Sequence, residues 1–70
     1  MNNFERKELG KKIIDLITRK KSVTTQDILD RFPEPIKDVK ETLIYLQKLK
    51  KIYAIEKPVK SPNKIMWDLK

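Results

Sequence analysis

The sequence predicts a single α+β domain in which three helices precede a small antiparallel β-hairpin. Apolar residues recur every three or four positions through the first 50 residues, which is the spacing of one helix face. From residue 52 onward they alternate with polar residues, which is the pattern of a strand. Because a chain of 70 residues suits one domain, both patterns are expected to belong to one unit, residues 1–70.

The first helix is expected over about residues 4–20. Acidic residues stand near its start and basic residues at its end, as the helix dipole favours. Gly10 costs roughly 1 kcal/mol in a helix interior, so the first turns are expected to fray. The face that this helix turns to the core carries Leu9, Ile13, Leu16 and Ile17.

A short second helix is expected over about residues 25–32, directly after a very short strand at Val23. Thr24 suits the N-cap, with Asp27 at the third helical position. The proline at 33 then stops the helix, because a residue that precedes proline is pushed out of the α region.

The third helix is expected over about residues 35–50, and Pro35 suits its first position. Its apolar residues follow one another at spacings of three and four, a strong amphipathic pattern. They are Ile36, Val39, Leu43, Leu46 and Leu49.

Strands are expected at residues 52–57 and 64–69, joined by a basic loop at 58–63. The first is rich in β-branched and aromatic residues, and the loop contains two prolines, Pro58 and Pro62. In the second, Ile65, Trp67 and Leu69 alternate with other residues, so that it can return antiparallel to the first.

This order of elements resembles the winged helix-turn-helix superfamily over nearly the whole chain. The stretch from Val39 to Leu46, followed by Ile52, is similar to the family's recognition helix and the apolar residue that opens the next strand. Residues 22–29 resemble the usual entry into the second helix. The resemblance implies the order helix, strand, helix, helix, strand, wing, strand. Many family members have glycine where Lys50 stands, and a lysine in that left-handed conformation costs on the order of 1 kcal/mol unless the turn takes another shape.

One branch of the superfamily binds left-handed Z-form nucleic acids, and Trp67 is similar to the tryptophan of its wing. The asparagine and the tyrosine that this branch uses on the third helix fall at Lys40 and Ile44, however. Its wing prolines are not matched beside Trp67 either. These departures argue against carrying Z-form recognition over to this chain.

The net charge of +7 and the pI near 9.8 favour an anionic partner, with double-stranded DNA ahead of a membrane surface. Residues 35–51 carry five basic and two acidic groups, and residues 52–70 carry four and two, although residues 1–21 carry seven and three. In helix-turn-helix docking the third helix enters the major groove while other elements hold phosphates. The residues expected at DNA are Lys37, Lys40, Glu41 and Ile44 in the groove and Lys48, Lys57, Lys60 and Lys64 on phosphates.

The third helix and the wing contain no arginine, the residue that most often reads guanine, so binding is expected to depend on shape and phosphates. The alternative is a protein-interaction module of a larger replication or transcription assembly. Its surface would be an apolar patch beside the third helix, unless Trp67 packs in the core as large aromatics usually do. A homodimer on a palindromic site also stays open. The patch would comprise Ile44, Tyr45, Tyr53, Met66 and Trp67.

Catalysis is not expected. The chain has no histidine or cysteine, so it lacks the usual zinc ligand sets and the usual nucleophile–base pairs. Its one glycine lies within a helix, which excludes a glycine-rich phosphate-binding loop, and its aspartates are dispersed along the chain. We expect no metal, no cofactor and no small-molecule ligand. No apolar run approaches the roughly 18–20 residues that span a bilayer, and the N-terminal residues lack the apolar stretch of a signal peptide. We expect a cytoplasmic transcriptional regulator or accessory factor. It would be located at the nucleoid in a prokaryote and in the nucleus in a eukaryote.

Overall fold

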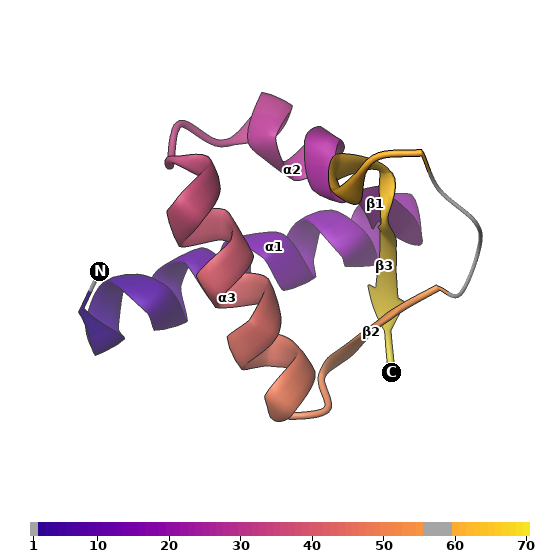
Figure 1. The fold of residues 1–70 in the computed structure, drawn as a ribbon. Helices are drawn as coiled ribbons and strands as arrows, with labels where there is room; N and C mark the ends of the chain where they lie inside the picture. The colour runs from indigo at the N-terminus through magenta and orange to yellow at the C-terminus, as the bar shows by residue number, and fades with distance from the viewer. Residues whose placement is uncertain (1, 56–59) are drawn as a thin grey trace.

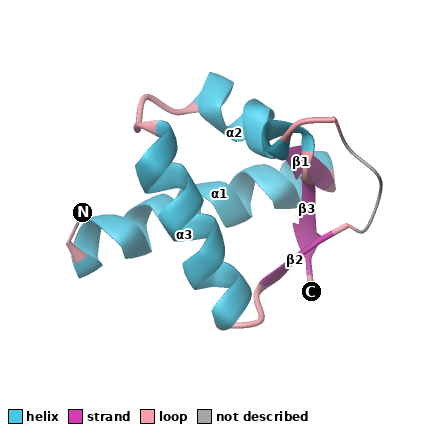
Figure 2. Cartoon of the chain, in the orientation of Figure 1, coloured by secondary structure: helices cyan, strands magenta, loops and turns pink. Residues whose placement is uncertain are grey.

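The computed structural model describes residues 2–55 and 60–70. Three helices and a three-stranded antiparallel sheet form the predicted α+β fold, as Figure 2 shows. The long α1 crosses α3, α2 lies near the start of α3, and the sheet stands beside the end of α1 (Figure 1). In chain order the elements are α1 (Asn3–Lys20), β1 (Ser22–Thr24), α2 (Thr25–Arg31), α3 (Ile36–Lys48), β2 (Ile52–Ala54), the 3₁₀ turn η1 (Pro62–Lys64) and β3 (Met66–Leu69).

The ends of α2 and the start of α3 follow local chemistry. The backbone N–H of Asp27 donates to Thr24 Oγ1 (3.0 Å), and Asp27 Oδ2 accepts from the backbone N–H of Thr24 (2.9 Å), which is the predicted capping box. The helix ends one residue earlier than predicted, because Phe32 precedes a proline and has extended backbone. Pro35 is the N-cap of α3 rather than its first residue, so α3 begins at Ile36.

At its other end α3 stops at Lys48 instead of about residue 50, because Lys50 takes a left-handed conformation with φ of 59°. The backbone N–H of Lys51 donates to the carbonyl of Leu46 (3.0 Å), and that of Lys50 donates to the carbonyl of Gln47 (3.0 Å). This pair of bonds is the Schellman motif, which usually has glycine at the left-handed position. The lysine therefore holds the strained conformation that the family resemblance implies.

The strands are shorter than predicted. β2 ends at Ala54, and residues 56–59, which include the rest of the first predicted strand and the start of the wing, lie outside the described residues. β3 begins at Met66 rather than 64, because residues 62–64 form η1. The sheet order is β1-β3-β2, and Trp67 pairs with Val23 on one side and with Ala54 on the other. The very short strand predicted at Val23 is confirmed.

The core lies between the sheet and the three helices. The apolar residues of the predicted third helix are buried except at its two ends, where Ile36 is 43% exposed and Leu49 is 48% exposed. Both positions lie at the ends of the helix, so the apolar pattern of the sequence is longer than the buried face. The buried apolar residues are Leu9, Ile13, Leu16, Ile17, Val23, Ile28, Val39, Leu43, Leu46, Ile52 and Trp67.

Gly10 lies where α1 approaches α3. It is buried, and a Cβ atom at this position would meet Leu46 Cδ2 at 3.2 Å, tighter than an ordinary van der Waals contact. α1 begins well ahead of this glycine, where the side chain of Asn2 accepts a hydrogen bond from the backbone N–H of Glu5 (2.8 Å). The glycine therefore allows the two helices to pack closely at their crossing.

Candidate nucleic-acid interface

The outer face of α3 carries all four of the residues predicted to face a DNA groove. Lys37, Lys40 and Ile44 follow at spacings of three and four, so they lie on the same side of the helix. All three are exposed, and Glu41 is exposed next to them. Ile44 is 51% exposed because Leu43, its neighbour, takes the position that faces the core. An apolar side chain thus stands among lysines on the solvent side of this helix.

Lys40 and Ile44 border a hollow between α3 and the start of β3. Its volume is about 240 Å³, and its wall is mostly apolar. Ile65 and Trp67 come to it from the returning strand of the hairpin, so that helix and wing meet at one place. The residues that line the hollow are Thr25, Lys40, Leu43, Ile44, Ile65 and Trp67.

Trp67 forms the rigid wall of this hollow. Only 7% of its surface is exposed, which confirms the interpretation that it packs in the core. The indole Nε1–H donates to Thr25 Oγ1 at 2.9 Å, and Thr25 is itself buried. This bond satisfies the one polar group of the indole inside the protein and holds the orientation of the ring.

The five residues predicted to form an apolar patch do not lie on one surface. Met66 and Trp67 are neighbours in β3 and therefore point to opposite faces of the sheet. Tyr53 is 41% exposed on β2 and does not line the hollow, whereas Tyr45 lies on the side of α3 that faces α1. Ile44 alone shares the hollow with Trp67.

The predicted phosphate-contacting residues are dispersed. Lys64 belongs to η1 and lines a depression beside Asp27 at the start of α2, apart from the hollow at Trp67. Lys60 is exposed, Lys57 lies outside the described residues, and Lys48 is exposed on the last turn of α3. The structure therefore gathers the predicted α3 residues on one helix and places Lys64 apart from them, beside the start of α2.

Arg6 is a basic residue of this face that the sequence patterns did not single out. It reaches α3 from the first turns of α1, where its Cζ atom lies 5.6 Å from the centre of the Tyr45 ring. With Glu41, Ile44 and Lys48 it lines a shallow depression on the outer side of α3. No local pattern links positions 6 and 45, so only the crossing of α1 and α3 reveals this arginine.

The lysines of α3 remain free of direct ion pairs within the part of the chain that the structure describes. There, the ion pairs use bases of α1: Lys11 with Glu8 (3.7 Å), Lys12 with Glu34 (3.9 Å) and Arg19 with Asp15 (3.0 Å). Lys37 and Lys40 share the outer face with Glu41, but neither lysine is held in an ion pair among the described residues. Their ammonium groups can therefore contact an anionic ligand.

Residues 2–55 and 60–70 contain no group of three or more histidine, cysteine, aspartate or glutamate side chains arranged to hold a metal ion. Among the same residues, no helix has the length and apolar character needed to cross a membrane.

Comparisons with known proteins give a structural match. No protein-family model matches the chain, and no curated protein sequence matches it. A solved structure that does match is the crystal structure of the Zalpha domain from Carassius auratus PKZ in complex with Z-DNA, with a TM-score of 0.79 and 18% sequence identity. The match covers 94% of this chain and 98% of that one. Together with the order of its helices and strands, this likeness shows that the chain has the winged helix-turn-helix fold.

Proposed function

We propose that this chain is a DNA-binding winged-helix domain, without catalytic activity of its own, that acts as a small transcriptional regulator or accessory factor. The proposal rests on one observation above all: Lys37 and Lys40 are exposed on the outer face of α3, beside the hollow at Trp67. In helix-turn-helix proteins this face of the recognition helix enters the major groove. The Zalpha domain of similar fold is itself bound to DNA, which supports the same partner class.

In this proposal the lysines supply most of the affinity. Lysine ammonium groups hold phosphates as point charges, so the complex forms largely through release of counterions. Ile44, exposed between them, would meet apolar base atoms such as a thymine methyl group. Arg6 would add a guanidinium at the edge of the same face. The resulting specificity for base sequence is modest.

We propose a right-handed duplex as the ligand, although the Zalpha domain of similar fold is bound to Z-DNA. Lys40 and Ile44 stand where the resemblance would require an asparagine and a tyrosine for Z-form recognition. Both residues line the hollow with Trp67, so the difference in side chains falls at the centre of the candidate site. A lysine and an isoleucine offer one charge and one apolar contact in place of an amide and a phenol.

A salt titration of binding to a fluorescein-labelled duplex tests the proposal. The logarithm of affinity should fall with the logarithm of salt concentration, with a slope of about −0.9 for each phosphate contacted. The variant Lys37→Ala/Lys40→Ala should bind much more weakly than Lys11→Ala/Lys20→Ala, a control of equal charge on α1. Equal losses would show diffuse attraction, and absence of duplex binding at low salt would refute the proposal.

The form of the duplex is tested separately with alternating dC–dG DNA and circular dichroism, because the spectrum changes with handedness. We expect the protein to leave this duplex right-handed. A protein-induced change to the left-handed spectrum would retain DNA binding and refute major-groove docking.

The second candidate function is a protein-interaction module, and it is favoured by the exposure of Ile44 beside an apolar hollow. Sedimentation of the protein with and without duplex distinguishes the two functions and measures self-association. A protein without duplex affinity whose self-association is removed by Ile44→Gln would support this candidate.

A further inference from the structure

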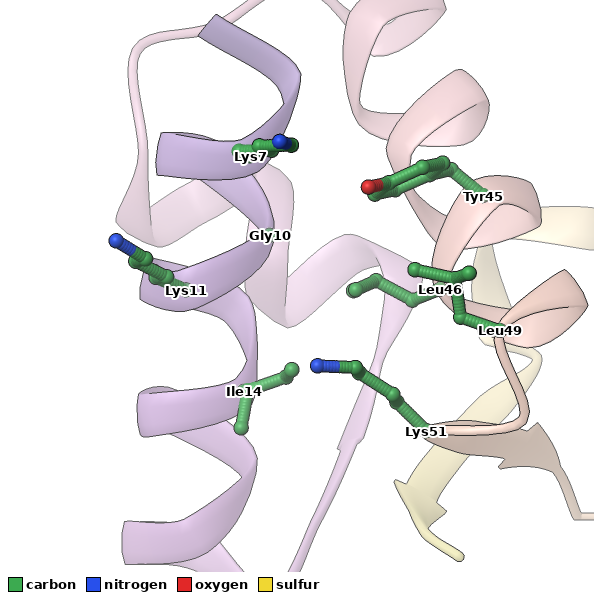
Figure 3. A pocket seen from close by; sticks show the side chains of 8 residues that line it. All are labelled: Lys7, Gly10, Lys11, Ile14, Tyr45, Leu46, Leu49 and Lys51. Carbon is green, nitrogen blue, oxygen red and sulfur yellow. The ribbon is translucent and has the colours of Figure 1, made fainter. Parts of the chain in front are cut away.

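A groove runs between α1 and the C-terminal half of α3, on the flank of α3 that lies away from the hollow at Trp67 (Figure 3). Successive residues of a helix are separated by about 100°. The α3 residues of the groove, Tyr45, Leu46 and Leu49, are therefore centred roughly opposite to Lys40 and Ile44 around the helix axis. A ligand in this groove would leave the proposed DNA-binding face open.

The floor of the groove is apolar and partly open to solvent. Ile14 of α1 is half-buried, and Leu49 at the end of α3 is 48% exposed. Gly10 packs against Leu46, which closes the bottom. The space measures about 200 Å³, below the roughly 300–1,000 Å³ of small-molecule pockets. An exposed apolar strip of this size suits a few side chains of a partner better than an enclosed small molecule.

The rim of the groove is positively charged. Lys7, Lys11 and Lys51 line it, and its lining among the described residues includes no acid. In Figure 3, Lys7 lies across from Tyr45 at one end, whereas the ammonium end of Lys51 points toward Ile14 at the other. The one ion pair at this rim, between Lys11 and Glu8, joins two largely exposed side chains and is therefore weak.

We propose that this groove binds an acidic, amphipathic helix of a partner protein. Such a helix would set apolar side chains, spaced by three and four residues, on Ile14 and Leu49 and direct its carboxylates to the three lysines. The domain would then hold DNA with one flank of α3 and an acidic partner with the other.

The charge distribution argues against a second copy of this chain as the occupant. Each copy carries a net charge of +7, so two lysine rims repel one another. In the acidic stretch, residues 22–34, Asp27 takes part in the capping box and Asp30 accepts from the amide of Gln26 (2.9 Å), whereas Glu34 is partly buried and lies 3.9 Å from Lys12. A partner with free carboxylates matches the rim better.

Nucleic acid is also a poorer match for this groove than for the outer face of α3. Phosphates would gain from the lysines, but the sugar-phosphate backbone would cover Ile14 and Leu49 without contributing apolar contacts. An amphipathic acidic helix uses both features of the groove, its charge and its apolar floor.

The test uses the 70-residue protein and a fluorescein-labelled helical peptide of about four turns, with leucines spaced by three and four residues and glutamates on both sides. Fluorescence anisotropy should detect binding, and chemical-shift changes should centre on Gly10, Ile14 and Leu49. The double variant Lys7→Gln/Lys11→Gln should weaken binding by about tenfold, whereas Lys37→Gln/Lys40→Gln, of equal charge, should change it by less than about twofold. Leu49→Gln should also weaken it.

A second peptide, with serine in place of every leucine, separates the apolar contribution from charge and should bind much more weakly. Equal binding of both peptides, or equal losses in both double variants, would overturn the proposal in favour of diffuse attraction. Shift changes centred on Ile44 and Trp67 would also overturn it, as would absence of binding at about 1 mM peptide. Self-association that Leu49→Gln abolishes would identify a second copy as the occupant instead.

Discussion

The two flanks of α3 are both hollowed, but they are built in different ways. Next to β3, the hollow is walled by Trp67, whose ring is buried and held by a hydrogen bond to Thr25. Next to α1, the groove lies where Gly10 lets α1 pack closely against α3, and a half-exposed Leu49 stands at its edge. One recess therefore depends on a large buried side chain, and the other lies beside a helix crossing that has no room for a larger one. The comparison predicts that a smaller side chain will destabilise the first flank and a larger side chain will destabilise the second.

Truncation of the aromatic wall should have the largest effect. Trp67→Ala removes a buried aromatic from the middle strand and leaves a cavity, so the free energy of unfolding should fall by about 3–5 kcal/mol. Urea unfolding is followed by circular dichroism. Tryptophan fluorescence is unsuitable, because Trp67 is the single tryptophan of the chain and the variant removes it. In a domain of this size such a loss approaches the whole stability.

Trp67→Phe serves as the milder comparison, since it keeps much of the packing and loses the hydrogen bond to Thr25. A loss of about 1–3 kcal/mol is expected. A cost below about 0.5 kcal/mol for both Trp67 variants would mean that the ring does not hold this flank together.

Crowding the helix crossing beside the other recess should have the next largest effect. Gly10→Val places a branched side chain against Leu46 at the helix crossing and should cost about 1–3 kcal/mol, measured by urea unfolding. Gly10→Ala is the matched control. Its gain of about 1 kcal/mol in helix propensity is opposed by the 3.2 Å contact, so its net change should be small. Equal stability of the valine variant and the natural chain would show that α1 and α3 separate without cost.

The residue that ends α3 gives a smaller effect of opposite sign. Lys50→Gly removes the penalty of a left-handed lysine and should raise the free energy of unfolding by about 0.5–1 kcal/mol. Lys48→Gly, two residues earlier and within the helix, should instead lower it by about 1 kcal/mol. Thermal unfolding of both variants compares them directly. A loss of stability in both would mean that the strain at Lys50 is compensated elsewhere.

The smallest effect is expected at the edge of the groove. Leu49→Gln should change stability by less than about 0.5 kcal/mol, because this side chain is already half-exposed in the folded protein. Leu46→Ala, one turn earlier and buried, should cost about 2–5 kcal/mol by the same urea measurement. Similar costs at the two positions would show that Leu49 is part of the core and unavailable to a partner.

Local rules account for most of the fold. The helix period identified Val39, Leu43 and Leu46 as core, and the capping chemistry of Thr24 located the start of α2. These features depend on residues a few positions apart, which one helical turn brings together. The periodicity extends to Ile36 and Leu49, which are exposed, because spacing along a helix does not show where the elements packed against it leave its ends uncovered.

The candidate site was predictable only in part. The exposed set on α3 follows from the helix itself, so Lys37, Lys40 and Ile44 were identified from spacing. The position of Lys64 was not, because the residue belongs to η1 and lies beside the start of α2. Arg6 was missed because it joins this face through the crossing of two helices.

The sequence by itself determined the order of the elements and the core face of α3, since both follow from patterns a few residues long. The left-handed conformation of Lys50 was one of two shapes that the sequence left open for the end of α3, and the structure decided between them. Tertiary structure decided what the two flanks of α3 became. The bond between Trp67 and Thr25 spans 42 positions, and the approach of Gly10 to Leu46 spans a similar distance along the chain. No periodicity of three, four or two connects such pairs, and only the packing of α1 and β3 against α3 brings them together.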